Sequence, residues 1–274
     1  MPSWVVTGAS RGLGYEFVKQ ISQDPSNVVI GLVRNRTTSL SALLELEKTR
    51  KNLHIVEADV TNDIALEKAV GEVKKFTGGT LDTLVNNAAL SSQERSGYEL
   101  DGYPNDEKEL LEQDLLANFK TNVIGVIKVI NSLLPLIRAT ATASGSARVI
   151  TLNSGLGDVD MTIKSEVTFG GPYSISKAAL LLAIAKYAVK YKKENIIFLS
   201  ISPGLVDTAT EPPTPETLEA YAHMVKTFQI GYPNWNGVPI TPEESVSAML
   251  NVLKGLTIND TGAFISHKGN KEWL

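Results

Sequence analysis

Apolar runs rich in β-branched residues alternate with helical stretches along nearly the whole chain. Continuous apolar strands between helices predict a parallel sheet with helices on both faces. Right-handed crossovers then give the strand order 3-2-1-4-5-6-7, with a ligand at the carboxyl ends of the strands. The pattern predicts an α/β fold with a doubly wound, seven-stranded parallel sheet. The expected strands cover residues 3–7, 28–33, 53–57, 83–86, 148–153, 196–202 and 263–266, and the expected helices cover 12–23, 39–49, 64–76, 107–137, 174–192 and 242–253.

The length and composition suit one large domain over residues 1–274. The chain has 274 residues, of which 43% are hydrophobic, and this is enough for a sizeable core. A net charge of -4 argues against a nucleic-acid partner, and the absence of cysteine excludes disulfides and thiolate metal sites. No apolar run approaches the ~20 residues that span a bilayer, and the first expected strand leaves no room for a signal peptide. We therefore expect a cytoplasmic protein with no membrane partner.

Three polar or turn-rich segments interrupt the alternation, at residues 91–105, 155–172 and 209–238. Each follows the carboxyl end of an expected strand, where loops of this architecture meet the substrate. Long loops in a compact domain are commonly binding loops or lids, and a disordered surface insertion is the alternative. The last segment carries a helical piece over 216–228 and several aromatic residues. We therefore interpret residues 209–238 as a substrate lid.

Gly8, Gly12 and Gly14 follow the first expected strand with the spacing T-G-x-x-x-G-x-G. Gly8 is expected to make the tight turn, Gly12 to let the backbone approach a pyrophosphate, and Gly14 to allow close helix–sheet packing. A lone glycine pattern is a weak indication, because glycines also mark ordinary turns. Here it lies between a strand and a helix, where backbone N–H groups and the helix dipole favour a phosphate. The segment predicts a Rossmann dinucleotide-binding domain.

The end of the second expected strand indicates which dinucleotide binds. An acidic residue at this position would hydrogen-bond the ribose 2′-hydroxyl of NAD(H). The strand instead ends in Arg34, and Arg11 lies within the glycine turn. Two guanidinium groups near the ribose favour a 2′-phosphate, so we expect NADP(H) as the cofactor. The alternative is that Arg34 and Arg36 are solvated loop cations.

Tyr173 and Lys177 belong to the segment Tyr-Ser-Ile-Ser-Lys. On a helix, this spacing puts the phenol and the ammonium on one face, one turn apart. A phosphate-binding turn combined with such a pair indicates nucleotide-dependent redox chemistry.

With these motifs in this order, the chain resembles the short-chain dehydrogenase/reductase family over nearly its whole length. Residues 86–89 are similar to the family's N-N-A-G segment, and residues 202–208 resemble its P-G-x-V-x-T segment. The ending from Gly262 to Trp273 resembles the branch of sniffer-type carbonyl reductases and fungal polyketide ketoreductases. The resemblance implies the catalytic residues Asn122, Ser154, Tyr173 and Lys177. It also implies a cofactor-binding set of Thr7, Gly8, Ser10, Arg11, Gly12, Leu13, Gly14, Arg34, Asp59, Val60, Asn87, Ala88, Tyr173, Lys177, Pro203, Gly204, Val206 and Thr208.

Three features depart from the family's pattern. Asn153 stands where many members have a first serine, and Ala89 replaces the last glycine of N-N-A-G. The spacing between Ser154 and Tyr173 is longer than the family often has. The extra length falls in residues 155–172, where we expect it to reshape the substrate pocket and leave the chemistry unchanged.

The resemblance implies a mechanism for carbonyl reduction, with Tyr173 as the general acid. A free phenol has a pKa of about 10, so the Lys177 ammonium and the positive oxidised nicotinamide are expected to lower the pKa of Tyr173. Ser154 would hold the substrate oxygen, and Lys177 would also bind the nicotinamide ribose. Asn122 would support a water-linked proton relay. Each residue also has a structural alternative: a half-buried tyrosine, a turn or cap serine, a solvated lysine and a buried amide.

We therefore expect an NADPH-dependent ketoreductase that acts reversibly on a small-molecule carbonyl substrate, apolar or polycyclic in character. A dinucleotide-binding redox sensor or scaffold is the alternative without turnover, and imine reduction, enoyl reduction or cofactor-assisted dehydration are the alternatives among enzymes. The scattered His54, His223 and His267 predict no metal site. Family analogy implies a homodimer or homotetramer, with the helices over 107–137 and 174–192 as the expected interface.

Overall fold

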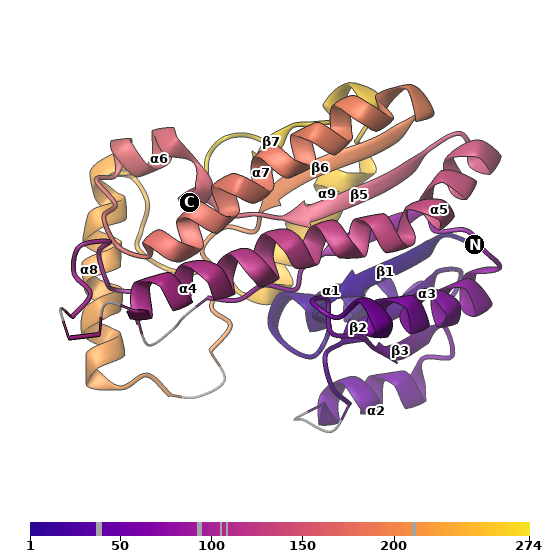
Figure 1. The fold of residues 1–274 in the computed structure, drawn as a ribbon, viewed down its shortest axis with the longest axis horizontal. Helices are drawn as coiled ribbons and strands as arrows, with labels where there is room; N and C mark the ends of the chain where they lie inside the picture. Colours follow the sequence, from indigo (N-terminus) through magenta and orange to yellow (C-terminus); the bar gives the residue numbers. More distant parts are fainter. Residues whose placement is uncertain (37–39, 92–94, 105, 108, 210–211) are drawn as a thin grey trace.

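The computed structural model contains one seven-stranded sheet in which all neighbouring strands are parallel (Figure 1). It describes residues 1–36, 40–91, 95–104, 106–107, 109–209 and 212–274. The order β3-β2-β1-β4-β5-β6-β7 confirms the predicted fold. Each strand begins and ends within one residue of its predicted range. The strands are β1 Ser3–Thr7, β2 Val28–Val33, β3 Leu53–Glu57, β4 Thr83–Asn86, β5 Ala147–Leu152, β6 Ile196–Ser202 and β7 Phe264–Ser266.

Most helices lie close to their predicted positions. The parts of the predicted segments that fall on residues 37–39, 92–94, 105, 108 and 210–211 lie outside the described residues. The helices are α1 Gly12–Ile21, α2 Ser41–Thr49, α3 Asp63–Thr77, α4 Glu109–Phe119, α5 Val126–Ser144, α6 Val159–Lys164, α7 Gly171–Tyr191, α8 Pro215–Gly231 and α9 Pro242–Lys254, with 3₁₀ turns η3 Gly155–Gly157, η4 Lys192–Glu194 and η5 Ile258–Asp260.

Alternate side chains of the strands enter two hydrophobic cores, one on each face of the sheet. Val5 and Leu84 belong to the core under α3, α5 and α7. Their neighbours Val6 and Val85 belong to the core under α1, α2 and α9. Because helices cover both faces, the strands are apolar at nearly every position, and β6 is buried along its whole length.

The centre of the chain differs from the prediction of a single helix over 107–137. α4 runs into a π-helical segment, η2 (Lys120–Gly125), and then into α5, which continues to Ser144. Gly145, in the left-handed region at φ 86°, ends the helix. The sequence placed this end too early because residues 138–144 lack large apolar side chains. π-Helical turns are rare and frequently occur at functional sites.

The same helix corrects the expectation that no apolar run is long enough to span a bilayer. Among the described residues, Glu109–Ser144 is the one helix that is long and apolar enough by length and composition. Half of its most apolar window is buried inside the fold. Its packing against α3, α7 and the sheet accounts for its apolar side chains.

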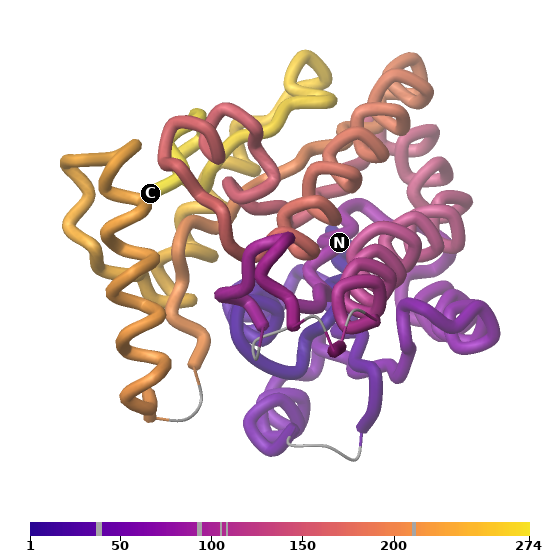
Figure 2. Tube along the Cα trace, turned by 60° about the vertical axis from the view of Figure 1, so that its left-hand side comes forward, coloured from indigo at the N-terminus to yellow at the C-terminus, as the bar shows by residue number. Residues whose placement is uncertain are grey.

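The loops after β5 and β6 meet in a third hydrophobic core. α6, which the sequence did not predict within 155–172, contributes Met161, and α8 contributes Phe228. Phe264 of β7 and Trp273 stack in this core with their ring centroids 4.4 Å apart. Both views place α8 at one end of the molecule, near the C-terminus (Figures 1 and 2). Two long loops and the C-terminal tail therefore pack together beyond the carboxyl ends of the strands.

Candidate active site

The glycine turn between β1 and α1 has backbone geometry that other residues would disrupt. Gly8 and Gly12 lie in the left-handed region, at φ 68° and φ 56°. A Cβ on Gly14 would lie 2.2 Å from the carbonyl oxygen of Gly8, far inside van der Waals contact. Ser10 and Leu13 are half-buried in the same turn. The close approach of α1 to the end of β1 therefore requires glycine.

Thr7 and Asn87 lock this turn to the end of β4. The Thr7 hydroxyl accepts hydrogen bonds from the backbone N–H groups of Asn87 and Ala88, each at 3.0 Å. The Asn87 side chain donates to the carbonyl oxygens of Thr7 at 2.9 Å and Gly8 at 3.1 Å. These hydrogen bonds thus hold the glycine turn in place against the end of β4.

The segment after β6 approaches the glycine turn. Its Gly204 is at φ 83°, and the carbonyl oxygen of Pro203 accepts a 2.7 Å hydrogen bond from the Ser245 hydroxyl of α9. A Cβ on Gly12 would lie 3.4 Å from the Thr208 methyl group. Val206 forms a parallel bridge to Ile240, which holds the segment from outside. Residues 203–208 and the glycine turn therefore face each other across the carboxyl edge of the sheet.

The ends of β2 and β3 place a cation and a carboxylate close together. Arg34 is exposed after β2, and Arg11 is exposed at the N-cap of α1. Asp59, half-buried beside Val60, accepts 2.8 Å hydrogen bonds from the backbone N–H and the hydroxyl of Thr61. Burial acts to raise the pKa of Asp59, but these bonds and nearby cations, including Arg34, hold it below its ordinary value. Arg34 therefore lies close enough to act on Asp59.

Ser154 and Tyr173 come from different elements and meet side chain to side chain. Ser154 follows β5, and its hydroxyl accepts a 3.2 Å hydrogen bond from the N–H of Leu156. Tyr173 is half-buried in the first turn of α7. Burial raises the pKa of Tyr173 to about 12, while its side-chain hydrogen bond with Ser154 acts to lower it.

Lys177 lies one turn further along α7 and is only 3% exposed. Its Nζ donates to the carbonyl oxygen of Leu152 at 2.9 Å and lies 5.5 Å from the ring centroid of Tyr173. Burial lowers the pKa of Lys177 to about 8. The predicted lowering of the Tyr173 pKa depends on the oxidised nicotinamide as well as on Lys177, and it stays a prediction. Loss of hydration of the phenolate dominates, and the ammonium is directed to the end of β5.

Asn122 is fully buried in η2 and joins two other segments. Its Oδ1 accepts from the N–H of Leu90 at 2.7 Å, and its Nδ2 donates to the Leu90 carbonyl at 2.9 Å. Nδ2 also donates to the Ser176 hydroxyl at 2.9 Å, and Ser176 donates to the Tyr173 carbonyl at 2.7 Å. The side chain thus ties the chain after β4 to the first turn of α7, as the buried-amide alternative predicts.

Comparison with known proteins agrees with this geometry. The family model described as short chain dehydrogenase matches residues 3–219. The chain belongs to the short-chain dehydrogenase/reductase family. The short chain dehydrogenase virK of Hypocrea virens is 43% identical over 277 residues. The short-chain dehydrogenase/reductase atnB of an Arthrinium species is 40% identical over 278 residues, and both matches cover 100% of each chain.

Solved structures of carbonyl reductases share the fold of this short-chain dehydrogenase/reductase. The carbonyl reductase Sniffer of D. melanogaster is 25% identical with a TM-score of 0.79. The NADPH-bound carbonyl reductase from chicken fatty liver is 25% identical with a TM-score of 0.78. Both matches cover 98% of each chain. The predicted resemblance to the sniffer-type branch is therefore confirmed.

The glycine turn fits the nicotinamide dinucleotide that short-chain dehydrogenase/reductases use. At Gly8 and Gly14, a Cβ would fall within 3 Å of backbone atoms, so no side chain fills the turn. The turn opens α1, whose first N–H groups have no partner within the helix and suit a phosphate. The residues present thus suit the pyrophosphate of such a cofactor.

Sequence reasoning missed two residues that hold the Ser154 segment of this enzyme. Asn153 accepts the N–H of Ser154 at 2.9 Å and donates to the carbonyl oxygen of Lys177 at 3.3 Å. The Ser202 hydroxyl accepts the N–H of Gly155 at 3.3 Å. The departure from serine at Asn153 was the one indication in the sequence, and nothing there pointed to Ser202.

Two of the three predicted long loops are joined in the structure of this enzyme. Glu99 and Phe169 form an antiparallel bridge, and the Thr168 hydroxyl donates to the Glu99 carboxylate at 2.6 Å. A Cβ on Gly171 would lie 2.5 Å from a methyl group of Leu100. The loop after β4 therefore packs directly on the start of the Tyr173 helix.

Proposed function

We propose that the protein is an NADPH-dependent ketoreductase that reduces a ketone or aldehyde to an alcohol, reversibly. The observation that carries this proposal is the meeting of the Ser154 and Tyr173 side chains, with Lys177 one turn away on α7. A hydroxyl and a phenol at one point of the carboxyl edge provide a binding group and a proton donor for a carbonyl oxygen. A dinucleotide sensor without turnover has no need of this arrangement.

A bound nicotinamide provides the hydride that the carbonyl carbon receives. The Ser154 hydroxyl would hydrogen-bond the substrate oxygen and hold it beside the phenol. Tyr173 would give its phenolic proton to that oxygen as negative charge develops, and its raised pKa keeps the phenol in the donor form. Lys177 would hold the nicotinamide ribose and help return a proton to Tyr173. Asn122 would fix the first turn of α7 and support the water-linked relay.

The preference for NADPH over NADH is inferred from Arg34 and Arg11. Arg34 is exposed at the end of β2, where a guanidinium can pair with a 2′-phosphate and an acidic residue could not. The chicken carbonyl reductase of similar fold was solved with NADPH bound. Because cells keep their NADPH pool reduced, we propose carbonyl reduction as the working direction, in the cytoplasm.

The substrate is proposed to be apolar or polycyclic, covered by the lid over residues 209–238. Phe228 of α8 lies 6.1 Å, between ring centroids, from both Phe169 and Trp235. The Lys164 ammonium lies 4.2 Å from the Tyr232 ring centroid and fixes the C-terminal end of α8 on α6. These aromatic rings would favour burial of apolar surface over hydrogen bonding to a polar chain.

We also propose a homodimer or homotetramer formed through α4, η2 and α7. α4 and α7 lie side by side (Figure 1) and contact each other. Exposed apolar side chains on these segments support an interface. These side chains are Leu116, Phe119, Ile124, Ile175, Leu182 and Val189. Sedimentation velocity would test the oligomeric state.

The proposed function is tested by NADPH consumption with aliphatic, steroidal and polycyclic aromatic ketones, with NADH in parallel. We expect turnover on at least one class, faster with NADPH, and loss of turnover in Tyr173→Phe. Tight NADPH binding without turnover on the whole panel would favour the sensor alternative.

A further inference from the structure

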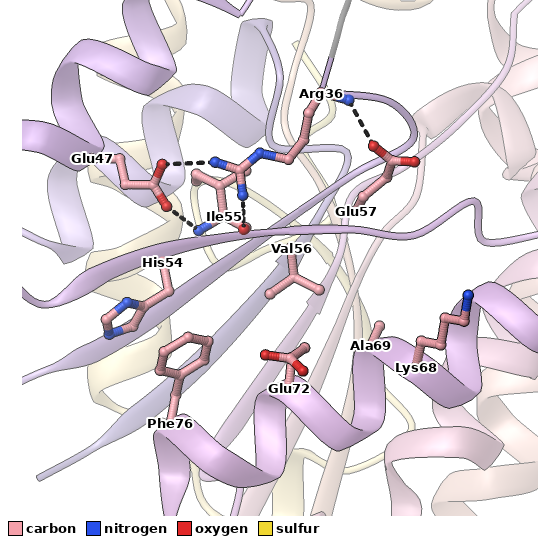
Figure 3. A pocket seen from close by; sticks show the side chains of 10 residues that line it. All are labelled: Arg36, Glu47, His54, Ile55, Val56, Glu57, Lys68, Ala69, Glu72 and Phe76. Atoms are coloured by element: carbon pink, nitrogen blue, oxygen red, sulfur yellow. Dashed lines mark hydrogen bonds and ion pairs between the residues drawn. The ribbon is translucent and has the colours of Figure 1, made fainter.

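An ion pair closes the outer edge of β3, the last strand of the sheet (Figure 3). Arg36 and Glu47 of α2 pair at 3.1 Å. The Ile55 N–H donates to the Glu47 carboxylate at 2.7 Å, and the Ile55 carbonyl accepts from the Arg36 guanidinium at 2.7 Å. One ion pair thus satisfies the two backbone groups of Ile55 that face away from β2. The pair borders a hollow of about 360 Å³ between β3, α2 and α3.

The same contacts fix the chain on both sides of Arg34. Before it, the Val33 carbonyl accepts a 2.8 Å hydrogen bond from the N–H of Ala58. After it, the backbone N–H of Arg36 donates to the Glu57 carboxylate at 3.1 Å. The path of the backbone through Arg34 is therefore set by β3 at one end and by Arg36 at the other.

Arg36 is a poor candidate for a direct phosphate ligand in this arrangement. Its guanidinium runs along the β3 edge to Glu47 and Ile55 (Figure 3). Engaging a phosphate would require breaking an ion pair and a hydrogen bond to the strand. Arg34 faces no such cost, since its side chain is exposed beside Asp59.

We propose that Arg36 and Glu47 are positioning residues for cofactor specificity: by clamping the turn to the β3 edge, they hold Arg34 where it pairs with the 2′-phosphate. This rests on the proposed preference for NADPH. The ion pair is partly exposed, at 44% for Arg36 and 26% for Glu47. The clamp should therefore shift the population of the competent turn by a modest factor.

Replacing Glu47 distinguishes the clamp from simple electrostatics, because the two predict opposite changes in the affinity for a 2′-phosphate. Removing a carboxylate near an anion site should strengthen anion binding by charge alone, and freeing Arg36 as a second ligand would strengthen it further. If the carboxylate positions the turn, its removal weakens binding. The matched control is Glu45→Gln, which removes the same charge from α2 at a residue paired with Lys48 instead.

The experiment measures binding of 2′,5′-ADP and 5′-AMP to the full chain by calorimetry, so it does not depend on turnover. We expect Glu47→Gln to weaken 2′,5′-ADP about five-fold and to leave 5′-AMP unchanged, with Glu45→Gln like wild type. Glu57→Ala, which removes the acceptor for the Arg36 backbone, should weaken 2′,5′-ADP in the same way and provides a second test if Glu47→Gln folds poorly.

Unchanged or tighter 2′,5′-ADP binding in Glu47→Gln and Glu57→Ala would overturn the clamp. Arg34→Ala distinguishes this failure from that of the proposed function. If Arg34→Ala loses the preference for 2′,5′-ADP but both glutamate variants keep it, only the clamp is wrong. If Arg34→Ala also keeps it, the preference for NADPH is not set by Arg34, and the clamp and the assignment to Arg34 both fail. If wild type shows no preference for 2′,5′-ADP, the proposed preference for NADPH itself fails.

Discussion

The side-chain amide of Asn153 donates to the backbone carbonyl of Lys177 and spans the gap between β5 and α7 at 3.3 Å. The same side chain accepts the N–H of Ser154 at 2.9 Å. One buried residue therefore sets the spacing between the strand that carries Ser154 and the helix that carries Tyr173 and Lys177. A carbonyl oxygen held between Ser154 and Tyr173 would depend on that spacing.

We expect Asn153→Ala to lower kcat by about 10- to 100-fold, because a small misplacement of the catalytic groups is costly. The free energy of unfolding should fall by about 1–3 kcal/mol, since buried polar partners are left unpaired. NADPH binding, measured by fluorescence, should change little. Asn153→Ser, which restores the serine that many family members have, should recover part of kcat. Equal losses in Asn153→Ala and Asn153→Ser without any change in stability would contradict this role.

Gly14→Ala should abolish dinucleotide binding and lower the free energy of unfolding by about 1–3 kcal/mol or more. The added Cβ would collide with the Gly8 carbonyl oxygen at 2.2 Å, so the turn must open. Gly71→Ala in α3 is the matched control, because a Cβ there meets nothing within 4 Å. It should stabilise the helix by about 0.5–1 kcal/mol. Urea unfolding and NADPH titration test both variants. Normal cofactor binding by Gly14→Ala would refute the glycine turn as the dinucleotide site.

Ser154→Ala should lower kcat by about 100- to 1,000-fold, as expected for loss of a donor to a developing oxyanion. It should also raise the pKa of Tyr173, because the Ser154 hydrogen bond acts to lower it. Alcohol oxidation requires the phenolate, so its rise with pH should move to more alkaline values in the variant. The pH profile of alcohol oxidation measures this shift. A profile that moves toward acid would show that Ser154 does not contact the phenol in the working enzyme.

Lys177 should make stability rise with pH between about pH 8 and pH 10. Burial lowers its pKa to about 8 from 10.5, so the unfolded chain binds more protons in this window and folding is favoured as pH rises. Tyr173, whose pKa is raised from 10.0 to about 12, acts in the opposite direction above pH 10. Relative to Lys177→Met, wild type should gain on the order of 1–2 kcal/mol across the window. Urea unfolding at a series of pH values measures this. If the free energy of unfolding changes equally with pH in the two proteins, Lys177 is not buried as described.

The strand order and the glycine turn could be predicted because both depend on local pattern. Apolar strands mark a doubly covered sheet, and handedness restricts their order. The π turn that holds Asn122 could not be predicted, because helical periodicity gives no sign of where a tertiary contact inserts a residue. The link from Asn153 to Lys177 and the raised pKa of Tyr173 depend on how α7 crosses the end of β5, which no single segment encodes. From the sequence, Arg36 could equally be a solvated loop cation, because its partners Glu47 and Ile55 lie on other elements and meet it only in the folded chain.

The most direct test follows deuterium from NADPH labelled at its transferable position into the alcohol product, for wild type and Tyr173→Phe in a single turnover. We expect wild type to place deuterium on the former carbonyl carbon of an apolar ketone. Tyr173→Phe should bind the labelled cofactor normally and transfer almost none. Equal transfer by Tyr173→Phe, or tight cofactor binding by wild type without transfer to any ketone, would contradict carbonyl reduction through Tyr173.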